Sequence, residues 1–133
     1  MKAAVADTHA LVWFATGQTS RLGRDALAHF RRVDEQRALV YVPSISLVEL
    51  LENVRAGSIR LPLPAQAWVG GLLSTGCVAV ADLTLDVALA TRELFEIPER
   101  ADGIISATSR VLDLPLITRD PEIGRAASVE VIW

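Results

Sequence analysis

Four acidic residues stand where an apolar run of the sequence gives way to a helical pattern. Asp7 follows the run 2–6, Glu49 falls just after the run 39–42, Asp102 opens a helical stretch, and Asp120 follows the run 116–118. Carboxylates a few ångströms apart repel one another and recruit protons or a divalent cation. Oxygen ligands without a cysteine cluster favour Mg²⁺ or Mn²⁺ over Zn²⁺. Such a site suits phosphodiester hydrolysis, because the ion orients the phosphate and lowers the pKa of an attacking water.

The elements that must position these acids alternate along the chain. Strands are predicted at about 2–6, 39–42, 77–80, 116–118 and 129–132, and helices at about 8–16, 21–33, 44–57, 65–74, 84–95 and 101–112, with a short helix after Pro121. Strands that alternate with helices pair in parallel through right-handed crossovers. We therefore expect an α/β fold, a three-layer α/β/α sandwich with a four- to five-stranded parallel sheet, as one domain over residues 1–133. The carboxyl ends of its strands share one edge, so the four acids should meet there.

Each acid also has a structural explanation that needs no chemistry. Asp7 and Asp120 suit the N-cap position of a helix, the latter with proline at the first helical position. Glu49 has capping-box spacing from Ser46, and Asp102 suits the positive end of a helix macrodipole. Only the combination of the four indicates a metal site.

Composition narrows the classes of function. No apolar run approaches the roughly 20 residues of a membrane span, and the N-terminus does not read as a secretory signal, so we expect a cytoplasmic protein with no membrane contact. The single cysteine, Cys77, excludes an internal disulfide. A net charge of −3 argues against a generally nucleic-acid-binding surface. The basic residues are nevertheless almost all arginine, which binds phosphate bidentately. Two explanations remain for this arginine content: a local phosphate-binding patch, or a codon bias of the genome.

Five segments of the chain can be compared with known families. They are 5–13, 43–50, 57–62, 102–108 and 116–120, which read VADTHALVW, PSISLVEL, GSIRLP, DGIISAT and LITRD. These segments resemble the PIN-domain ribonucleases and, within them, the VapC toxins of bacterial toxin–antitoxin pairs. They occur in family order with family spacing, and the likeness covers essentially the whole chain.

The resemblance implies a Mg²⁺-dependent endoribonuclease that hydrolyses RNA with a metal-activated water, with Mn²⁺ as a substitute ion. It also implies a homodimer and a cognate antitoxin protein that occludes the site. The implied catalytic and metal-binding residues are Asp7, Glu49, Asp102 and Asp120, and the Thr118 hydroxyl is implied to lie close to the metal.

One segment departs from the family. Many of these toxins carry a His-Arg-Asp-Pro-Phe-Asp-Arg run before the sixth helix, whereas residues 97–103 here read IPERADG. Asp102 is the acid that matches, but the basic and aromatic neighbours are absent or moved. Glu99 or Arg100 is expected to replace some of the substrate contacts of that loop.

Further side chains have both a functional and a structural interpretation. Ser46 could reach a metal-bound water or the substrate, although a helix cap accounts for it fully. Arg100 and Arg119 could bind the phosphate, or could be surface charges that offset the acids. Trp13 and Phe14 could form part of an apolar groove for an antitoxin helix, with core burial expected for one of them.

Two other functions remain as alternatives. A phosphoacceptor signalling receiver domain is also a small α/β domain, but it requires an acidic pair near the end of the first strand and a lysine after a late strand. This chain has one acid there, and its only lysine is Lys2. The other alternative is a PIN-like fold that serves only as a non-catalytic binding module, against which the presence of all four acids argues.

Overall fold

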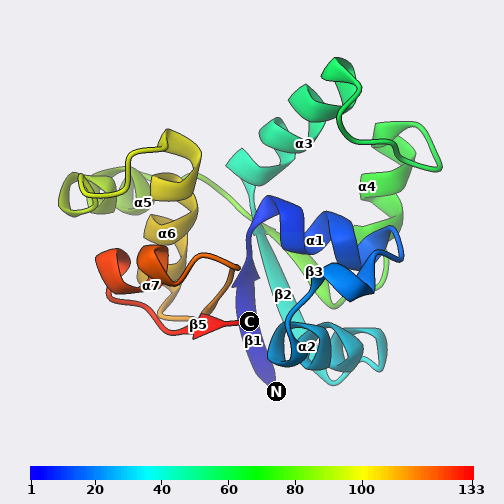
Figure 1. Ribbon diagram of the computed structural model, residues 1–133, viewed down its shortest axis with the longest axis horizontal. Coiled ribbons are helices and arrows are strands. Elements are labelled where there is room, and N and C mark those ends of the chain that lie inside the picture. Colours follow the sequence, from blue (N-terminus) through cyan, green and yellow to red (C-terminus); the bar gives the residue numbers. More distant parts are fainter.

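Five parallel strands form one sheet in the computed structural model, which describes residues 1–133 (Figure 1). Along the sheet the strands follow the order β3-β2-β1-β4-β5. All four strand pairs are parallel. The strands are β1 (Lys2–Ala6), β2 (Ala38–Pro43), β3 (Val78–Ala81), β4 (Leu116–Ile117) and β5 (Val131–Ile132).

Helices cover both faces of this sheet. They are α1 (Thr8–Ala15), α2 (Arg24–Asp34), α3 (Ser44–Ala56), α4 (Ala65–Leu73), α5 (Leu85–Ala90), α6 (Arg100–Leu112) and α7 (Pro121–Ala127), with short 3₁₀ turns η1 (Thr19–Arg21) and η2 (Thr91–Glu93). Side chains of β1 alternate between the faces, as a strand requires. Ala4 and Ala6 lie in the cluster that α1 and α2 complete, whereas Val5 packs with Ile105 of α6. The predicted three-layer α/β/α sandwich with a parallel sheet is confirmed.

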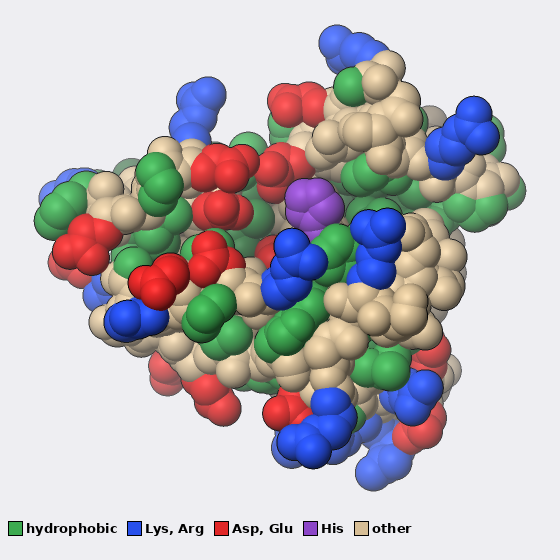
Figure 2. Space-filling view, in the orientation of Figure 1, with side chains coloured by type: hydrophobic (Ala, Val, Ile, Leu, Met, Phe, Trp, Pro, Cys, Tyr) green, Lys and Arg blue, Asp and Glu red, His purple; other side chains and the backbone are tan.

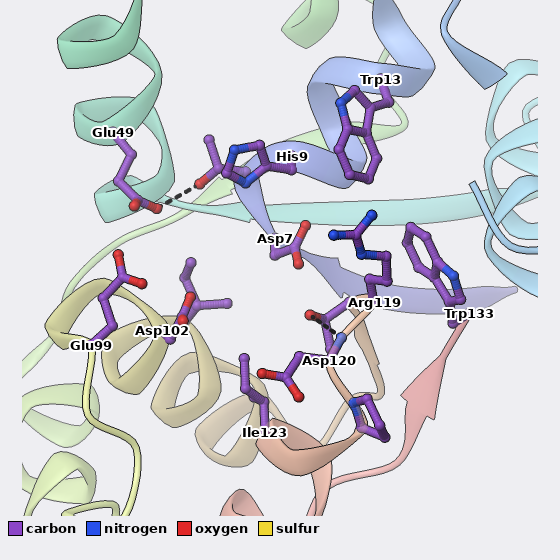
Figure 3. A pocket seen from close by; sticks show the side chains of 14 residues that line it. Asp7, His9, Trp13, Glu49, Glu99, Asp102, Arg119, Asp120, Ile123 and Trp133 are labelled. Atoms are coloured by element: carbon purple, nitrogen blue, oxygen red, sulfur yellow. Dashed lines mark hydrogen bonds between the residues drawn. The ribbon is translucent and has the colours of Figure 1, made fainter. Parts of the chain in front are cut away.

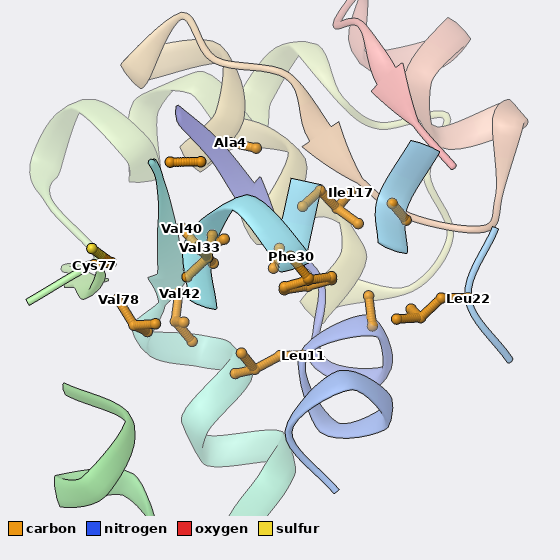
Figure 4. Packing of buried hydrophobic residues seen from close by; sticks show 14 residues of the cluster. Ala4, Leu11, Leu22, Phe30, Val33, Val40, Val42, Cys77, Val78 and Ile117 are labelled. Carbon is orange, nitrogen blue, oxygen red and sulfur yellow. The ribbon is translucent and has the colours of Figure 1, made fainter. Parts of the chain in front are cut away.

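The largest core cluster lies between the central strands and the pair α1 and α2 (Figure 4). Phe30 of α2 is its largest buried side chain. Phe14 stacks on it, with ring centroids 4.6 Å apart and an interplanar angle of 12°. Trp13 and Phe14 are both partly buried and both pack against this cluster, so neither is a fully buried core residue. The stacking of Phe14 on Phe30 fixes α1 against the sheet.

Strand pairing fixes where the functional edge lies. Ala6 of β1 is in register with Ile117 of β4, so both strands end at the same height. The Asp7 backbone N–H donates to the Ile117 carbonyl over 3.1 Å, which places the residues after each strand side by side. Asp7 and Thr118 consequently start from neighbouring positions on one edge.

Three predicted elements are shorter than expected. The helix predicted at 84–95 ends at Ala90 and continues only as η2, since the Leu94 N–H bonds to Thr91 in a tighter turn. The helix predicted from residue 21 begins at Arg24, after Gly23 at the N-cap. The strand predicted at 129–132 pairs only at 131–132, because the Val129 N–H donates to Gly124 at the end of α7. None of the helices is both long and apolar enough to cross a membrane.

Candidate active site

An open cleft of about 450 Å³ lies at the carboxyl edge of the sheet. All four predicted acids line it, together with Glu99 as a fifth (Figure 3). Acidic side chains gather on this part of the surface, and basic side chains border it on the side of α1 (Figure 2). The cleft therefore brings together carboxylates that the sequence spreads over more than a hundred residues.

Asp7 caps α1 and also faces the cleft. Its Oδ1 accepts the Ala10 N–H over 2.9 Å, so the predicted N-cap is confirmed. Burial raises the pKa of Asp7, although the Ala10 amide, the Thr118 hydroxyl and the charges of His9 and Arg119 oppose that rise. Capping uses one oxygen of the carboxylate, so the cap does not exclude a second role in the cleft.

Glu49 is held by a residue other than the predicted one. Its Oε1 accepts a hydrogen bond of 2.8 Å from the Thr8 hydroxyl at the start of α1. The predicted capping box with Ser46 is wrong, because α3 already begins at Ser44 after Pro43 at the N-cap, without a side-chain cap. Ser46 thus lies inside the helix, where its hydroxyl is buried without a partner, and it does not line the cleft.

Asp102 lies in the first turn of α6, with Glu99 just before the helix. Burial is the largest of the effects that raise the pKa of Asp102 to about 6, and the nearby charges of Glu99, Glu49 and Asp7 add to it. No arginine in the structure pairs with Asp102. Its carboxylate therefore experiences the combined repulsion of a cluster that the protein leaves uncompensated.

Asp120 and Thr118 form the wall opposite α6. Asp120 caps α7 by accepting the Glu122 N–H over 2.9 Å, with Pro121 at the first helical position as predicted. The buried Thr118 hydroxyl accepts the Asp120 N–H over 3.4 Å. These bonds fix the backbone of the turn between β4 and α7.

An aromatic and basic wall closes the other side of the cleft. Trp13 and Trp133 meet edge to face, with ring centroids 6.3 Å apart. The ring centroids of His9 and Trp13 are 5.7 Å apart. The Arg119 guanidinium carbon lies 5.7 Å from the Trp13 centroid, and its side chain extends toward Asp7 (Figure 3). Arg100 is exposed at the start of α6 and is not among the cleft residues. Of the two arginines considered, only Arg119 reaches the cleft.

The donor set suits a hard divalent cation in its chemistry. Five carboxylates and the hydroxyls of Thr8 and Thr118 supply oxygen, and only one arginine and one histidine line the same cleft. No three acidic, histidine or cysteine side chains converge closely enough to hold a metal ion in this arrangement of the side chains. A cation bound by three of these carboxylates therefore requires side-chain rotation.

Thr8 and Trp133 line the cleft, but the sequence did not predict a functional role for either of them. Thr8 follows Asp7 directly, so a single strand-to-helix turn delivers an acid and the hydroxyl that holds a second acid. Trp133 reaches the cleft because β5 pairs with β4 and because its carbonyl accepts the N–H groups of Asp25 and Ala26 at the start of α2. These tertiary contacts join segments far apart in the sequence.

Comparison with solved structures supports the fold. VapBC2 from Rickettsia felis, bound to a DNA fragment of its promoter, superposes with a TM-score of 0.71 at 14% identity, covering 97% of this chain and 96% of that chain. DNA-bound VapBC from Salmonella typhimurium gives 0.68 at 18%, covering 98% and 97%. A toxin–antitoxin complex from Klebsiella pneumoniae gives 0.59 at 19%, covering 91% and 89%.

Comparison by sequence identifies the family. No curated protein sequence matches the chain. The sequence profile of the PIN domain matches residues 4–129, which include most of β1, all of β2, β3 and β4, and all of the acids in the cleft. The chain belongs to the PIN-domain family.

Proposed function

We propose that the chain is a Mg²⁺-dependent endoribonuclease that acts in the cytoplasm as a VapC-type toxin, with one nuclease domain over residues 1–133. The observation that carries the proposal is the meeting of five carboxylates in one cleft of a PIN-domain chain. Carboxylates that only cap helices would not need to share a cleft, nor to be left with so few opposing charges. Membership of the PIN family removes the reason to consider a signalling receiver.

The proposed roles follow from the position of each side chain. Asp7, Glu49, Asp102 and Asp120 would hold Mg²⁺, or Mn²⁺ in its place. The bound ion would supply a more acidic water and stabilise charge on the phosphate.

The remaining groups orient the acids or the substrate. Thr8 holds Glu49 toward the cleft, and Thr118 supports Asp7 and the turn before Asp120. Arg119 is aimed between Asp7 and the tryptophans and would pair with a phosphate oxygen of the RNA.

We further propose two protein partners. The solved neighbours include a toxin–antitoxin complex, which supports a cognate antitoxin for this chain. Exposed apolar side chains on and beside α3 and α5 support a homodimer, and the bond from the Leu83 N–H to the Ser44 hydroxyl joins the starts of these helices. The residues concerned are Val48, Leu51, Leu83, Leu85 and Leu89.

RNA cleavage by the purified chain tests the proposed activity. Labelled RNA should be cut in Mg²⁺, and EDTA should abolish the cutting. Asp7→Asn keeps an N-cap oxygen for Ala10 but removes the charge, so it should lower the rate by about 100-fold or more. Equal rates in the variant and the parent chain would refute the assignment of the site.

A non-catalytic RNA-binding module is the second candidate. It is favoured by the lack of any three acids that converge in the present side-chain arrangement. The same experiment separates the two functions, because a binding module retains RNA in a filter or gel assay and leaves it intact in Mg²⁺ and in Mn²⁺.

A further inference from the structure

A second hollow adjoins the acidic cleft and has the opposite charge. Its volume is about 640 Å³, and it lies between α1, η1 and the end of α3 with the loop that follows. Arg21, Arg60 and Arg119 line it, and none of its 11 lining residues is acidic. Basic side chains border the acidic region on this side of the molecule (Figure 2). The hollow is therefore built for an anion.

The three arginines are available to a ligand. The four ion pairs of the structure involve other arginines, and all three of these side chains are exposed. The guanidinium carbon of Arg21 lies 5.6 Å from the Trp13 centroid, close to the 5.7 Å for Arg119. One half-buried indole thus restrains two guanidinium groups, which lowers the entropy lost when they bind an anion.

The two hollows adjoin one another. His9, Trp13 and Arg119 line both of them, so a chain-like ligand in one hollow can reach the other past these three side chains. A nucleic-acid strand has the matching character, with one phosphate among the acids and the next phosphates along the strand among the arginines. An acidic peptide would fill the basic hollow but has no group that needs the acidic cleft beside it.

We propose that this hollow binds the backbone of a single-stranded RNA segment next to the phosphate that is cut, with Arg21 and Arg60 as phosphate ligands. The assignment rests on the proposed function for its substrate class. It also gives the path of the bound RNA, because the strand runs from the acidic cleft toward α1 and the end of α3. Contacts to phosphate carry no sequence information, so this segment is held whatever its bases.

Salt-dependent binding tests the proposal without any cleavage. A fluorescent single-stranded RNA is titrated with the chain in EDTA at several salt concentrations, for the parent and for Arg21→Ala/Arg60→Ala. Each phosphate contact in a single strand contributes about 0.7 to the slope of log affinity against log salt. The double variant should bind more weakly on every RNA sequence, with a slope about 1.4 smaller. Arg31→Ala/Arg92→Ala removes the same charge outside both hollows and should keep the parent slope.

The outcomes separate this proposal from the nuclease activity. An unchanged slope in the double variant, in a chain that still cleaves RNA, overturns the basic hollow and leaves the proposed function standing. The expected slope in a chain that cuts no RNA supports the hollow and rejects the nuclease. If the double variant loses its affinity for a glutamate-rich peptide but keeps its affinity for RNA, the hollow binds a protein partner and the proposal is overturned. Thermal unfolding of both double variants verifies that they are folded.

Discussion

Asp102 carries a charge that its own surroundings disfavour. Burial and three neighbouring acids raise the pKa of Asp102 to about 6. An acid whose pKa is higher in the folded chain than in the unfolded chain destabilises the fold once it is ionised. Functional sites commonly keep such unfavourable charges because the ligand requires them.

Replacing Asp102 should separate stability from activity. Asp102→Asn is expected to raise the free energy of unfolding at pH 7 in EDTA by about 1 kcal/mol, a discounted value because the side chain is partly exposed and screened. At a pH well below about 4 the parent side chain is protonated in both the folded and the unfolded chain, so the difference should vanish. It should develop as the pH rises from about 4 to 6. Denaturant unfolding across this range measures it.

The control for this prediction is an acid outside the cleft. Asp86→Asn changes an exposed residue in the first turn of α5 and should give no gain in stability at any pH. RNA cleavage should be lost in Asp102→Asn alone. A variant at Asp102 that is less stable than the parent at pH 7 would show that this carboxylate is a structural group.

Single residues were predictable where local sequence determines their environment. Asp7 and Asp120 follow buried strands and begin helices, so both their caps and their shared edge could be inferred from the sequence. The partner of Glu49 could not, because Thr8 is 41 positions away and reaches it only through the approach of α1 to α3. Ser46 had the spacing of a cap, but the helix begins two residues earlier.

At the scale of elements, α7 owes its position to one glycine. A Cβ added to Gly124 would lie 2.1 Å from Val131 Cγ2 and 3.3 Å from the Val129 carbonyl oxygen. The helix that carries Asp120 at its start therefore packs directly on β5 and on the loop before it. A side chain here would push α7, and Asp120 with it, away from the sheet.

Gly124→Ala should consequently destabilise the fold by about 1–3 kcal/mol, despite the better helix propensity of alanine. Adding Val131→Ala removes the contacting methyl group and should recover part of the loss. Gly70→Ala in α4 is the matched control, because a Cβ there meets nothing within 4 Å and should leave stability equal or higher. Chemical denaturation compares the four chains, and equal midpoints for Gly124→Ala and Gly70→Ala would contradict the close approach.

The order and type of the elements followed from the sequence, while several ends did not. The alternation of apolar runs with helical periodicity predicts each strand and helix, and hence the parallel sheet. The end of α5 at Ala90 and the shortness of β5 depend on a 3₁₀ turn and on a backbone bond from Val129 to Gly124. Such hydrogen bonds depend on tertiary structure or on the local backbone conformation, which the pattern of apolar residues does not determine.

At the scale of the whole molecule, exposed apolar side chains lie on the surface proposed for a homodimer. Leu51 of α3 is 50% exposed and Leu85 of α5 is 73% exposed. Large apolar side chains exposed on neighbouring elements are typical of a protein interface. We expect the chain to sediment as a dimer, and Leu51→Glu to shift it to monomer because each protomer would bury an unpaired carboxylate in the interface.

Analytical ultracentrifugation measures the oligomeric state of the parent chain and of Leu51→Glu and so tests this prediction. Leu63→Glu changes an equally exposed leucine in the connector before α4 and should leave the dimer intact. A monomeric parent chain, or a dimer that Leu51→Glu does not weaken, would remove this surface from the proposed interface.

The acids of the cleft should bind a divalent cation. Mn²⁺ binding, followed by the loss of the electron paramagnetic resonance signal of the free ion, measures this without RNA or turnover. The parent chain and Asp86→Asn should bind Mn²⁺ with the same affinity, and Mg²⁺ should compete. Asp7→Asn and Asp102→Asn should each weaken binding about tenfold or more. Binding of equal affinity in all four chains, or no binding to the parent, would contradict the metal site.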